Sequence, residues 1–377
     1  MLLLGVAESM TGPYLVLFGS DRANLSPFAI GVFVSLVSVS GIAVSTLLGR
    51  RYDRSPARWP ALLAVIASAV GYLLLTTTTS YALLLIIAAT FLGTGTAAFA
   101  QLFVLARSHL QSTASQNSTR GTALLRSVWS LAWAIGPMVG AALLPWYGFT
   151  GLFVVTAVGF AAVAVPVLLA GPPPQPEASA SSAPAEASPS GRSVAVLVAS
   201  FALFHTAMFA GSVVLPLYVT DVLGQSESDV GFLFSVGAAV EIPAALALLL
   251  VPARANKKRL ILIGMALLLL YFVIIAISSN MTVLLLAQIA RGVAIAVVGA
   301  LGITYFQDLM PHATGRATTM FANSAAAGSL VSGVLAGSAA QIIGYRSTLL
   351  LCGALSALAW LLLTASRRTR PTETPTT

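Results

Sequence analysis

Four ionisable side chains lie deep inside long apolar segments of this sequence: Glu8, Arg126, Glu241 and Arg291. A charged side chain at the centre of a bilayer costs about 2.5–3.5 kcal/mol on insertion scales, so such a residue normally has a partner or a function. The N-terminal and C-terminal parts of the chain each hold one acid and one base. This distribution predicts one ion pair in each part.

Two interpretations of these pairs remain open. In the first, the acid and the base neutralise each other and only hold helices together. In the second, a carboxylate takes up a proton on one side of a membrane and releases it on the other. Burial disfavours an ionised carboxylate and a nearby arginine favours it, so a solute that moves close to the pair could change its affinity for the proton. Glu8 and Glu241 are the candidate carriers, because the other acids fall in expected loops, span ends, the linker or the tail.

Glu241 and Arg291 lie at similar depths in their segments, about twelve and ten residues from the same expected end. At 1.5 Å per helical residue, these depths agree within about 3 Å. We therefore predict that the two side chains approach within salt-bridge distance in at least one conformation.

Apolar segments long enough to cross a bilayer fill nearly the whole chain. Of its 377 residues, 58% are hydrophobic and 8% are charged, whereas soluble domains are about 45–50% apolar. A bilayer core of about 30 Å needs about 20 apolar helical residues. Runs of this kind begin near Met1, Phe28, Ala61, Tyr81, Thr122, Thr150, Val194, Val230, Leu260, Met281, Ala317 and Ser347. The sequence predicts an all-α membrane protein with twelve transmembrane helices and no sizeable soluble domain.

A change of composition divides the chain into two halves. Between Gly171 and Gly191 the sequence is rich in Pro, Ala, Ser and Glu, which cannot bury enough apolar surface to fold. We expect a six-helix half at 1–170, a flexible cytoplasmic linker at 171–193, a second six-helix half at 194–366 and a cytoplasmic tail at 367–377.

The two halves also resemble repeats. At an offset of 200 residues, Asp21, Ser26, Gly31, Ser35 and Ile42 recur as Asp221, Ser226, Gly231, Ser235 and Ile242. Gly148 and Gly344 fall in similar turns before the expected sixth and twelfth spans. Two pseudo-symmetric six-helix halves are typical of transporters that bind their solute between the repeats. The alternative is that the likeness reflects only the common composition of membrane segments.

The positions of the basic residues predict the topology. Fifteen of the 19 lysines and arginines fall in one set of alternate loops and in the C-terminal tail, and the opposite loops hold only Arg22 and Arg346. The positive-inside rule places the first set in the cytoplasm, together with both termini. The net charge of +8 is thereby explained without nucleic acid. We expect a multi-pass protein of the inner (plasma) membrane, with the lipid bilayer as its surroundings.

Other classes of site are not indicated. The chain has one cysteine, Cys352, so no intramolecular disulfide is possible. His109, His205 and His312 share no metal-ligand spacing with it, and no Walker A loop occurs, so no metal or cofactor is predicted. A membrane-embedded enzyme would need a compact nucleophile or metal cluster, and a sensor would need a signalling domain. We expect neither, and we expect a monomer.

Two motifs resemble those of the major facilitator superfamily. Gly49-x-x-x-Asp53-Arg54 follows the second expected span, as the loop signature of that superfamily does, although Pro56 stands where the family usually has a second glycine. Gly136-Pro137-x-x-Gly140 in the fifth span resembles the signature of its efflux members. Alone, the first motif could be a plain basic loop, and the second could be simple helix packing.

The chain is more specifically similar to the sugar efflux transporter family of that superfamily. The resemblance rests on Gln101–Arg107, Arg126, Ser130–Pro137, Tyr147–Thr150, Thr304–Pro311 and Gly315–Thr319. It implies proton-driven export of sugars or small sugar-like solutes. The alternative is a multidrug/proton antiporter of the same fold, which a wide apolar cavity would favour.

Six polar or aromatic residues inside spans are candidates for binding such a solute. They are Tyr14, Gln101, Trp129, Trp133, Gln288 and Asn323. Planar amides can pair with two hydroxyls, and aromatic faces can cover the C–H surface of a sugar ring. Each of the six could instead make an interhelical contact or face lipid. His205 is interpreted as a packing residue.

Overall fold

The structure is a computed structural model that describes residues 1–113, 118–170, 191–252, 255–311 and 313–366. The predicted tail and all but the last three residues of the predicted linker lie outside the described residues. Every regular element within the described ranges is helical.

Within each half, the helices follow one another along the chain with short connections. In the N-terminal half they are α1 (Leu2–Ser9), α2 (Tyr14–Leu17), η1 (Phe18–Arg22), α3 (Pro27–Arg54), α4 (Trp59–Leu75), α5 (Tyr81–Ile87), η2 (Ala88–Leu92), α6 (Gly93–Gly95), α7 (Ala98–Thr113) and α8 (Ser118–Leu169). In the C-terminal half they are α9 (Gly191–Leu217), η3 (Tyr218–Val222), α10 (Glu227–Ala247), η4 (Leu248–Leu250), α11 (Lys257–Ile277), α12 (Met281–Leu309) and α13 (Thr314–Ala365).

The described helices are consistent with twelve membrane spans. Nine helical segments are long and apolar enough to cross a bilayer, and Trp59–Leu75 is a shorter apolar helix. Two of the nine, α8 and α13, have 52 residues each and contain a glycine with non-helical backbone angles. Gly148 has φ 60° and Gly344 has φ 78°, a left-handed conformation that glycine adopts without steric cost. Each of these glycines therefore reverses the chain between two spans, as the sequence predicts.

The repeat predicted at an offset of 200 residues recurs in the local structure. Ser26 and Ser226 are the N-caps of α3 and α10, and their hydroxyls accept hydrogen bonds from the N–H groups of Ala29 and Asp229. The π-helices η1 and η3, at Phe18–Arg22 and Tyr218–Val222, immediately precede these caps. The two halves therefore share local geometry as well as composition.

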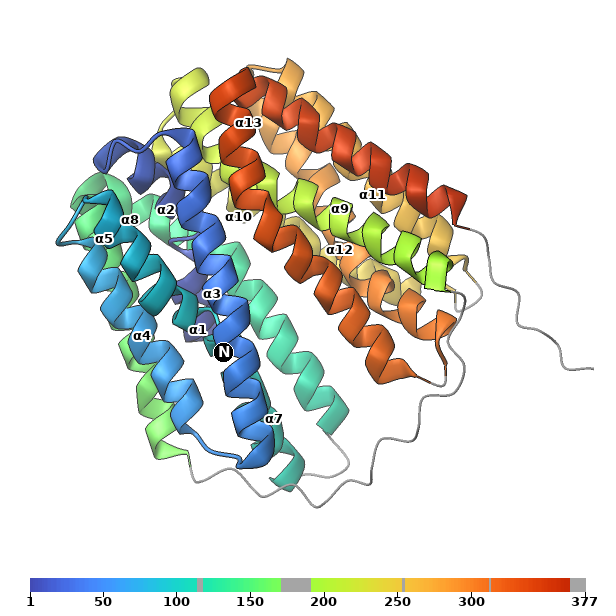
Figure 1. The fold of residues 1–377 in the computed structure, drawn as a ribbon, viewed down its shortest axis with the longest axis horizontal. Helices are drawn as coiled ribbons and strands as arrows, with labels where there is room; N and C mark the ends of the chain where they lie inside the picture. The colour runs from blue at the N-terminus through green and yellow to red at the C-terminus, as the bar shows by residue number, and fades with distance from the viewer. Residues whose placement is uncertain (114–117, 171–190, 253–254, 312, 367–377) are drawn as a thin grey trace, which may run out of the picture.

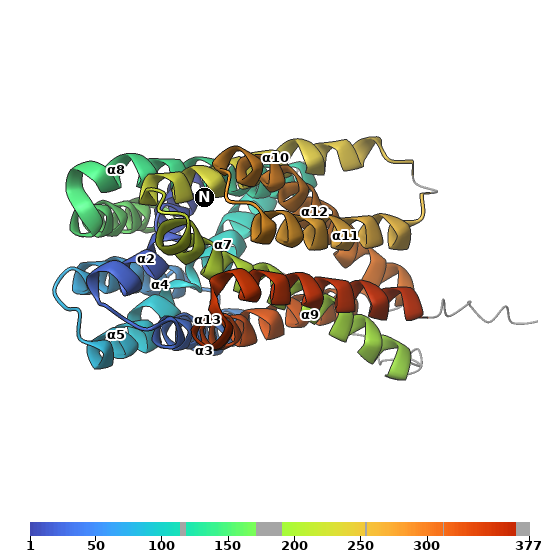
Figure 2. The same cartoon turned by 90° about the horizontal axis from the view of Figure 1, so that it is seen from above.

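The halves pack closely at one end of the bundle. We call the end that contains Gly148 and Gly344 the turn end, and the end where α8 stops and α9 starts the linker end. Figure 1 shows the helices of the two halves converging at the turn end and spreading apart toward the linker end. Seen from above in Figure 2, α13 lies beside α3 and α10 lies near α8, and these two helix pairs make the most extensive contacts between the halves.

The contact between α3 and α13 depends on backbone groups that approach closely. The Phe28 N–H donates to Gln341 Oε1 at 3.1 Å, and the Val334 N–H donates to Ser35 Oγ at 2.9 Å. Between these bonds, a Cβ atom on Gly31 would overlap the carbonyl oxygen of Gly333 and would lie 3.0 Å from Gly337 Cα. Small residues let membrane helices approach in this way. Below, this α3–α13 contact is called the glycine seam.

A larger side chain at Gly31 should separate the halves at the turn end. Overpacking of a close contact typically costs about 1–3 kcal/mol. We expect Gly31→Val to reduce several-fold the disulfide yield between cysteines introduced as Phe28→Cys and Gln341→Cys in a Cys352→Ala background. The matched control is Gly299→Val, because a Cβ atom at Gly299 meets nothing within 4 Å. Equal disulfide yields in the Gly31→Val and Gly299→Val variants would contradict the idea that the glycine seam holds the halves together.

Candidate functional site

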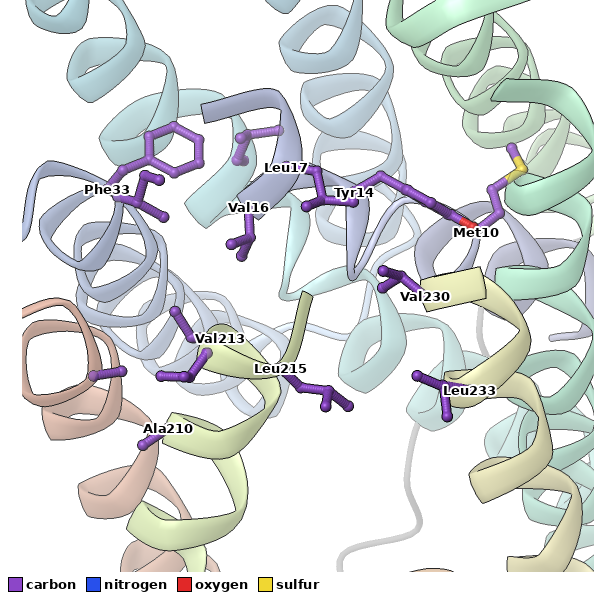
Figure 3. Close-up of a cluster of buried hydrophobic side chains, with 14 of the residues drawn as sticks. Met10, Tyr14, Val16, Leu17, Phe33, Ala210, Val213, Leu215, Val230 and Leu233 are labelled. Atoms are coloured by element: carbon purple, nitrogen blue, oxygen red, sulfur yellow. The ribbon is translucent and has the colours of Figure 1, made fainter. Parts of the chain in front are cut away.

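A cavity of about 410 Å³ lies between the two halves. Residues from α2, α3, α8, α9, α10, α12 and α13 line it, so no single half forms it. Figure 3 shows a cluster of buried side chains from both halves that includes Met10, Tyr14, Val16, Val213 and Leu233, and of these Val16 and Val213 also line the cavity. A hollow at the interface of the halves is where a transporter of this architecture is expected to bind its solute.

The two walls of the cavity differ in chemistry. The N-terminal half supplies a largely apolar wall that includes Leu15, Val16, Phe33, Val34 and Val37, with Trp133 and Ser38 as its polar groups. The C-terminal half adds both charges, Glu241 and Arg291, and the hydroxyls of Ser212, Ser329 and Ser332. Polar contacts to a solute would therefore come mainly from the second half.

The predicted pair in the second half faces this cavity. Glu241 on α10 and Arg291 on α12 both line it. Arg291 Nη2 donates to Ser212 Oγ at 3.4 Å, and its guanidinium carbon lies 5.4 Å from the centre of the Phe234 ring. Among the described residues, the pair forms no salt bridge within 4.0 Å in this conformation. The structure brings the two residues to one site, and their direct pairing stays a prediction.

A close crossing of α10 and α12 positions Arg291. A Cβ atom on Gly292 would lie 2.6 Å from the Gly237 carbonyl oxygen. A Cβ atom on Gly237 would lie 2.8 Å from Arg291 Nη1 and 3.0 Å from Gln288 Oε1. The two glycines therefore let the helix backbones meet and leave room for the guanidinium along α10. A lone Arg in the sequence gives no indication of this arrangement.

Of the pair predicted in the first half, the structure describes the side chain of Glu8 but not that of Arg126. Glu8 lies on α1, and its Oε2 atom is buried with no hydrogen-bond partner among the described residues. The nearby Thr11 hydroxyl donates to Tyr72 Oη at 2.8 Å. Arg126 lies in α8, but its side chain is outside the described part of the structure. The Glu8–Arg126 pair therefore stays a prediction.

The six predicted solute-binding residues lie in different environments. Trp133 lines the cavity, and its Nε1 has no partner among the described residues. Tyr14 is fully buried and donates to the Pro137 carbonyl at 3.1 Å. Trp129 packs on Phe99 with ring centres 4.3 Å apart.

The three predicted amides do not line this cavity. Gln101 and Gln288 are buried, with 4% and 0% of their surface exposed, and Gln288 Nε2 donates to Tyr271 Oη at 3.5 Å. Asn323 is exposed on α13. Sugar binding by these amides stays a prediction that would require another conformation.

The residues of the two motifs lie on α3 and α8. Gly49, Asp53 and Arg54 are at the linker-end part of α3, where Asp53 and Arg54 are exposed. Side chains at Gly136 and Gly140 would overlap Ser9 Oγ and the Met10 carbonyl oxygen, so both glycines allow α1 to lie against α8. Pro137 lies inside α8 and lines the cavity.

Sequence reasoning missed the serines of the cavity and one cluster at the turn end. Serine is common in membrane helices, so Ser212, Ser329 and Ser332 carry no local signal. The Asp21 carboxyl lies beside that of Glu227 in the other half. No group of three potential metal ligands occurs among the described residues.

Comparisons with known proteins agree over nearly the whole chain. The family model of the Major Facilitator Superfamily matches residues 1–254 and 244–377. A Deinococcus radiodurans protein named as a sugar efflux transporter is 36% identical over 375 residues, covering 98% of this chain and 96% of that protein. Sugar efflux transporter A of Escherichia coli K12 is 30% identical over 366 residues, covering 96% and 93%.

Solved structures share the fold at lower sequence identity. A mutant of the nucleoside transporter NupG matches with a TM-score of 0.82 at 14% identity, covering 97% of this chain and 98% of that one. A bacterial homologue of the lysosomal transporter Spinster matches with a TM-score of 0.75 at 12% identity, covering 98% and 95%. At these identities the likeness concerns the fold alone.

Removing one member of the Glu241–Arg291 pair should destabilise the protein more than removing both. A lone charge left in the membrane interior is expected to cost about 3–5 kcal/mol, and the double variant avoids it. We expect Glu241→Gln and Arg291→Ala each to lower the thermal unfolding midpoint in detergent by several degrees, and the double variant to recover part of the loss. Additive losses would contradict the pairing. Lys257–Asp308, a 2.6 Å surface bridge, is the control, with an expected effect under about 1 kcal/mol.

Proposed function

The chain belongs to the major facilitator superfamily and to its sugar efflux transporter family, and from this premise we propose that it exports sugars or small sugar-like solutes in exchange for protons. It is a multi-pass membrane transporter and not an enzyme. In the proposal it acts as a monomer in the inner (plasma) membrane. Both termini and the linker end face the cytoplasm, as the 15-to-2 bias of basic loop residues indicates.

The cavity between the halves is the observation that carries this proposal. It is lined by both halves and contains an acid and a base, while the glycine seam joins the halves at the turn end. Rocking of the halves about such a cavity would expose it to each side in turn. In the proposed orientation, this conformation is the one that takes up solute from the cytoplasm.

Sugars are favoured as the solute by two observations. The relatives at 36% and 30% identity carry the name sugar efflux transporter. The hydroxyls of Ser212, Ser329 and Ser332 line one wall of the cavity, where they can both donate to and accept from sugar hydroxyls. Trp133 supplies an aromatic face on the opposite wall.

Proton coupling is supported by the positions of the buried carboxyls. Glu241 lines the cavity beside Arg291, and Glu8 has a buried oxygen without a partner among the described residues. One elementary charge crossing 100 mV releases about 2.3 kcal/mol, enough for a roughly 50-fold solute gradient before any pH difference is added. A solute that reaches Arg291 would alter the field at Glu241 and so link its own binding to that of the proton.

A multidrug/proton antiporter is the second candidate, and the apolar wall favours it. Leu15, Val16, Phe33, Val34 and Val37 form a surface suited to apolar solutes. Counterflow of labelled sugars and of labelled lipophilic cations in proteoliposomes separates the two functions. We expect sugars to exchange at least tenfold faster than in liposomes without the protein. Exchange of the cations alone would replace the sugar proposal with the multidrug one.

Loss of the titrating carboxyl should separate uphill transport from exchange. We expect Glu241→Gln or Glu8→Gln to reduce pH-driven accumulation at least tenfold and to leave energy-independent exchange within about twofold, since a glutamine cannot take up a proton. Both activities are measured in the same proteoliposomes. Asp308→Asn, which removes an exposed acid outside the cavity, is the control and should alter neither activity. If both glutamine variants still accumulate solute, neither carboxyl is the sole carrier.

A further inference from the structure

A second hollow, of about 260 Å³, lies at the turn end within the N-terminal half. The connection after α4, the end of η1 and the part of α8 that follows Gly148 form it. Its lining residues are Phe18, Arg22, Leu75, Thr76, Thr77, Thr78, Thr79, Phe149, Thr150 and Phe153. None of them lines the cavity between the halves, so the two hollows are separate. We call this second hollow the Arg22 pocket.

The Arg22 pocket has an aromatic floor and a polar rim. The rings of Phe18, Phe149 and Phe153 are buried and contact one another, with ring centres 5.0–6.3 Å apart. Arg22 and Thr79 are exposed at the rim. A ligand with a polar group next to apolar carbons would match this arrangement, with its polar group at the rim and its carbons against the aromatic floor.

Arg22 carries a positive charge that is not neutralised by a described neighbour. Its guanidinium forms no hydrogen bond or ion pair with the residues that the structure describes. Its acidic neighbour Asp21 makes no ion pair with it and lies beside Glu227 of the other half. Arg346, the second basic residue of the turn end, differs: its Nη2 donates to Ser279 Oγ at 2.9 Å, and its guanidinium lies 5.9 Å from the Tyr218 ring centre.

The threonines of the rim provide further polar groups. The Thr76 and Thr77 hydroxyls donate to the Leu73 and Leu74 carbonyls at 2.6 and 2.8 Å, so these two close the end of α4. The Thr79 and Thr150 hydroxyls make no hydrogen bond within the described ranges. They are free to donate to an oxygen atom placed beside Arg22.

We infer that the Arg22 pocket binds a phosphate group, supplied by the headgroup of an anionic phospholipid or by a free phosphate. The guanidinium offers a planar set of donors that fits two phosphate oxygens at once, and the threonine hydroxyls supply additional donors. The aromatic floor accommodates the glycerol carbons of a lipid. A turn end beside lipid headgroups gives the pocket access to such a ligand. This inference does not depend on the proposed sugar export.

The experiment titrates purified full-length protein in detergent with phosphatidylglycerol and, separately, with phosphatidylcholine. Bound lipid is counted by native mass spectrometry, and the thermal unfolding midpoint is followed in parallel. We expect tighter binding of phosphatidylglycerol, because the choline ammonium of the second lipid is repelled by Arg22. Arg22→Gln should weaken phosphatidylglycerol binding about tenfold, the effect of losing one charge-assisted contact. Arg22→Lys should restore part of it.

Arg346→Gln is the matched control, since it removes the other turn-end cation, which already has partners. It should leave phosphatidylglycerol binding within about twofold of the unsubstituted protein. A separate titration with inorganic phosphate distinguishes the sources. Stabilisation by phosphate that Arg22→Gln abolishes, without a preference for phosphatidylglycerol, supports a site for free phosphate. Equal weakening by Arg22→Gln and Arg346→Gln, or no effect of Arg22→Gln on either ligand, would overturn the inference.

Discussion

Direct contact between helix backbones at the turn end is the constraint on which the rest of this structure depends. At the glycine seam, Gly31 of α3 lies against Gly333 and Gly337 of α13, with no side chain between them. On the other side of the bundle, Gly231 of α10 lies against the Pro137 carbonyl of α8. Because Gly31 and Gly231 are equivalent in the two halves, the same residue type joins both helix pairs. The distance between the halves is therefore set by backbone atoms at the glycine seam, and by the Pro137 carbonyl together with the Tyr14 hydroxyl at Gly231. The cavity forms where these contacts stop.

Close approach of helix backbones at glycines also occurs beside the cavity. Gly237 and Gly292 let α10 and α12 meet, and this crossing leaves the Arg291 guanidinium against the α10 backbone. A charge in such a position is costly unless other groups compensate it. Ser212 and the Phe234 ring supply part of that compensation here, while Glu241 faces the same cavity. Neither Ser212 nor Phe234 carries a negative charge, so Glu241 is the only described acid on the cavity wall that can balance Arg291.

The features predicted best from the sequence are those whose cause is local. Ser26 and Ser226, predicted only as matching positions of a repeat, both cap helices, because a serine before a helical segment can accept from its first N–H groups. Gly148 and Gly344 reverse the chain because their backbone angles suit glycine. Of the cavity lining, the candidates named from the sequence include only Trp133, Pro137, Glu241 and Arg291, and most of the lining could not be predicted in this way. Which face of an apolar helix meets the other half depends on packing between segments far apart in sequence. Tyr14 illustrates the difficulty. It is a polar residue inside a membrane span and was a candidate for solute binding, but its side chain is fully buried against α8.

The unequal walls of the cavity have a consequence for the motion of the halves. The scaffold is duplicated, but the charges and most hydroxyls belong to the C-terminal half. A solute bound by those groups would keep its polar contacts with the C-terminal half and move with it when the halves rotate. Against the N-terminal wall it would exchange one set of dispersion contacts for another, and such contacts are individually weak and non-directional. The barrier to reorientation would then vary little with the stereochemistry of the solute, whereas the affinity of binding would vary strongly. The C-terminal half would then determine which solutes bind, while the N-terminal half would make only non-specific apolar contacts with them. One carrier could therefore move several related solutes at similar rates.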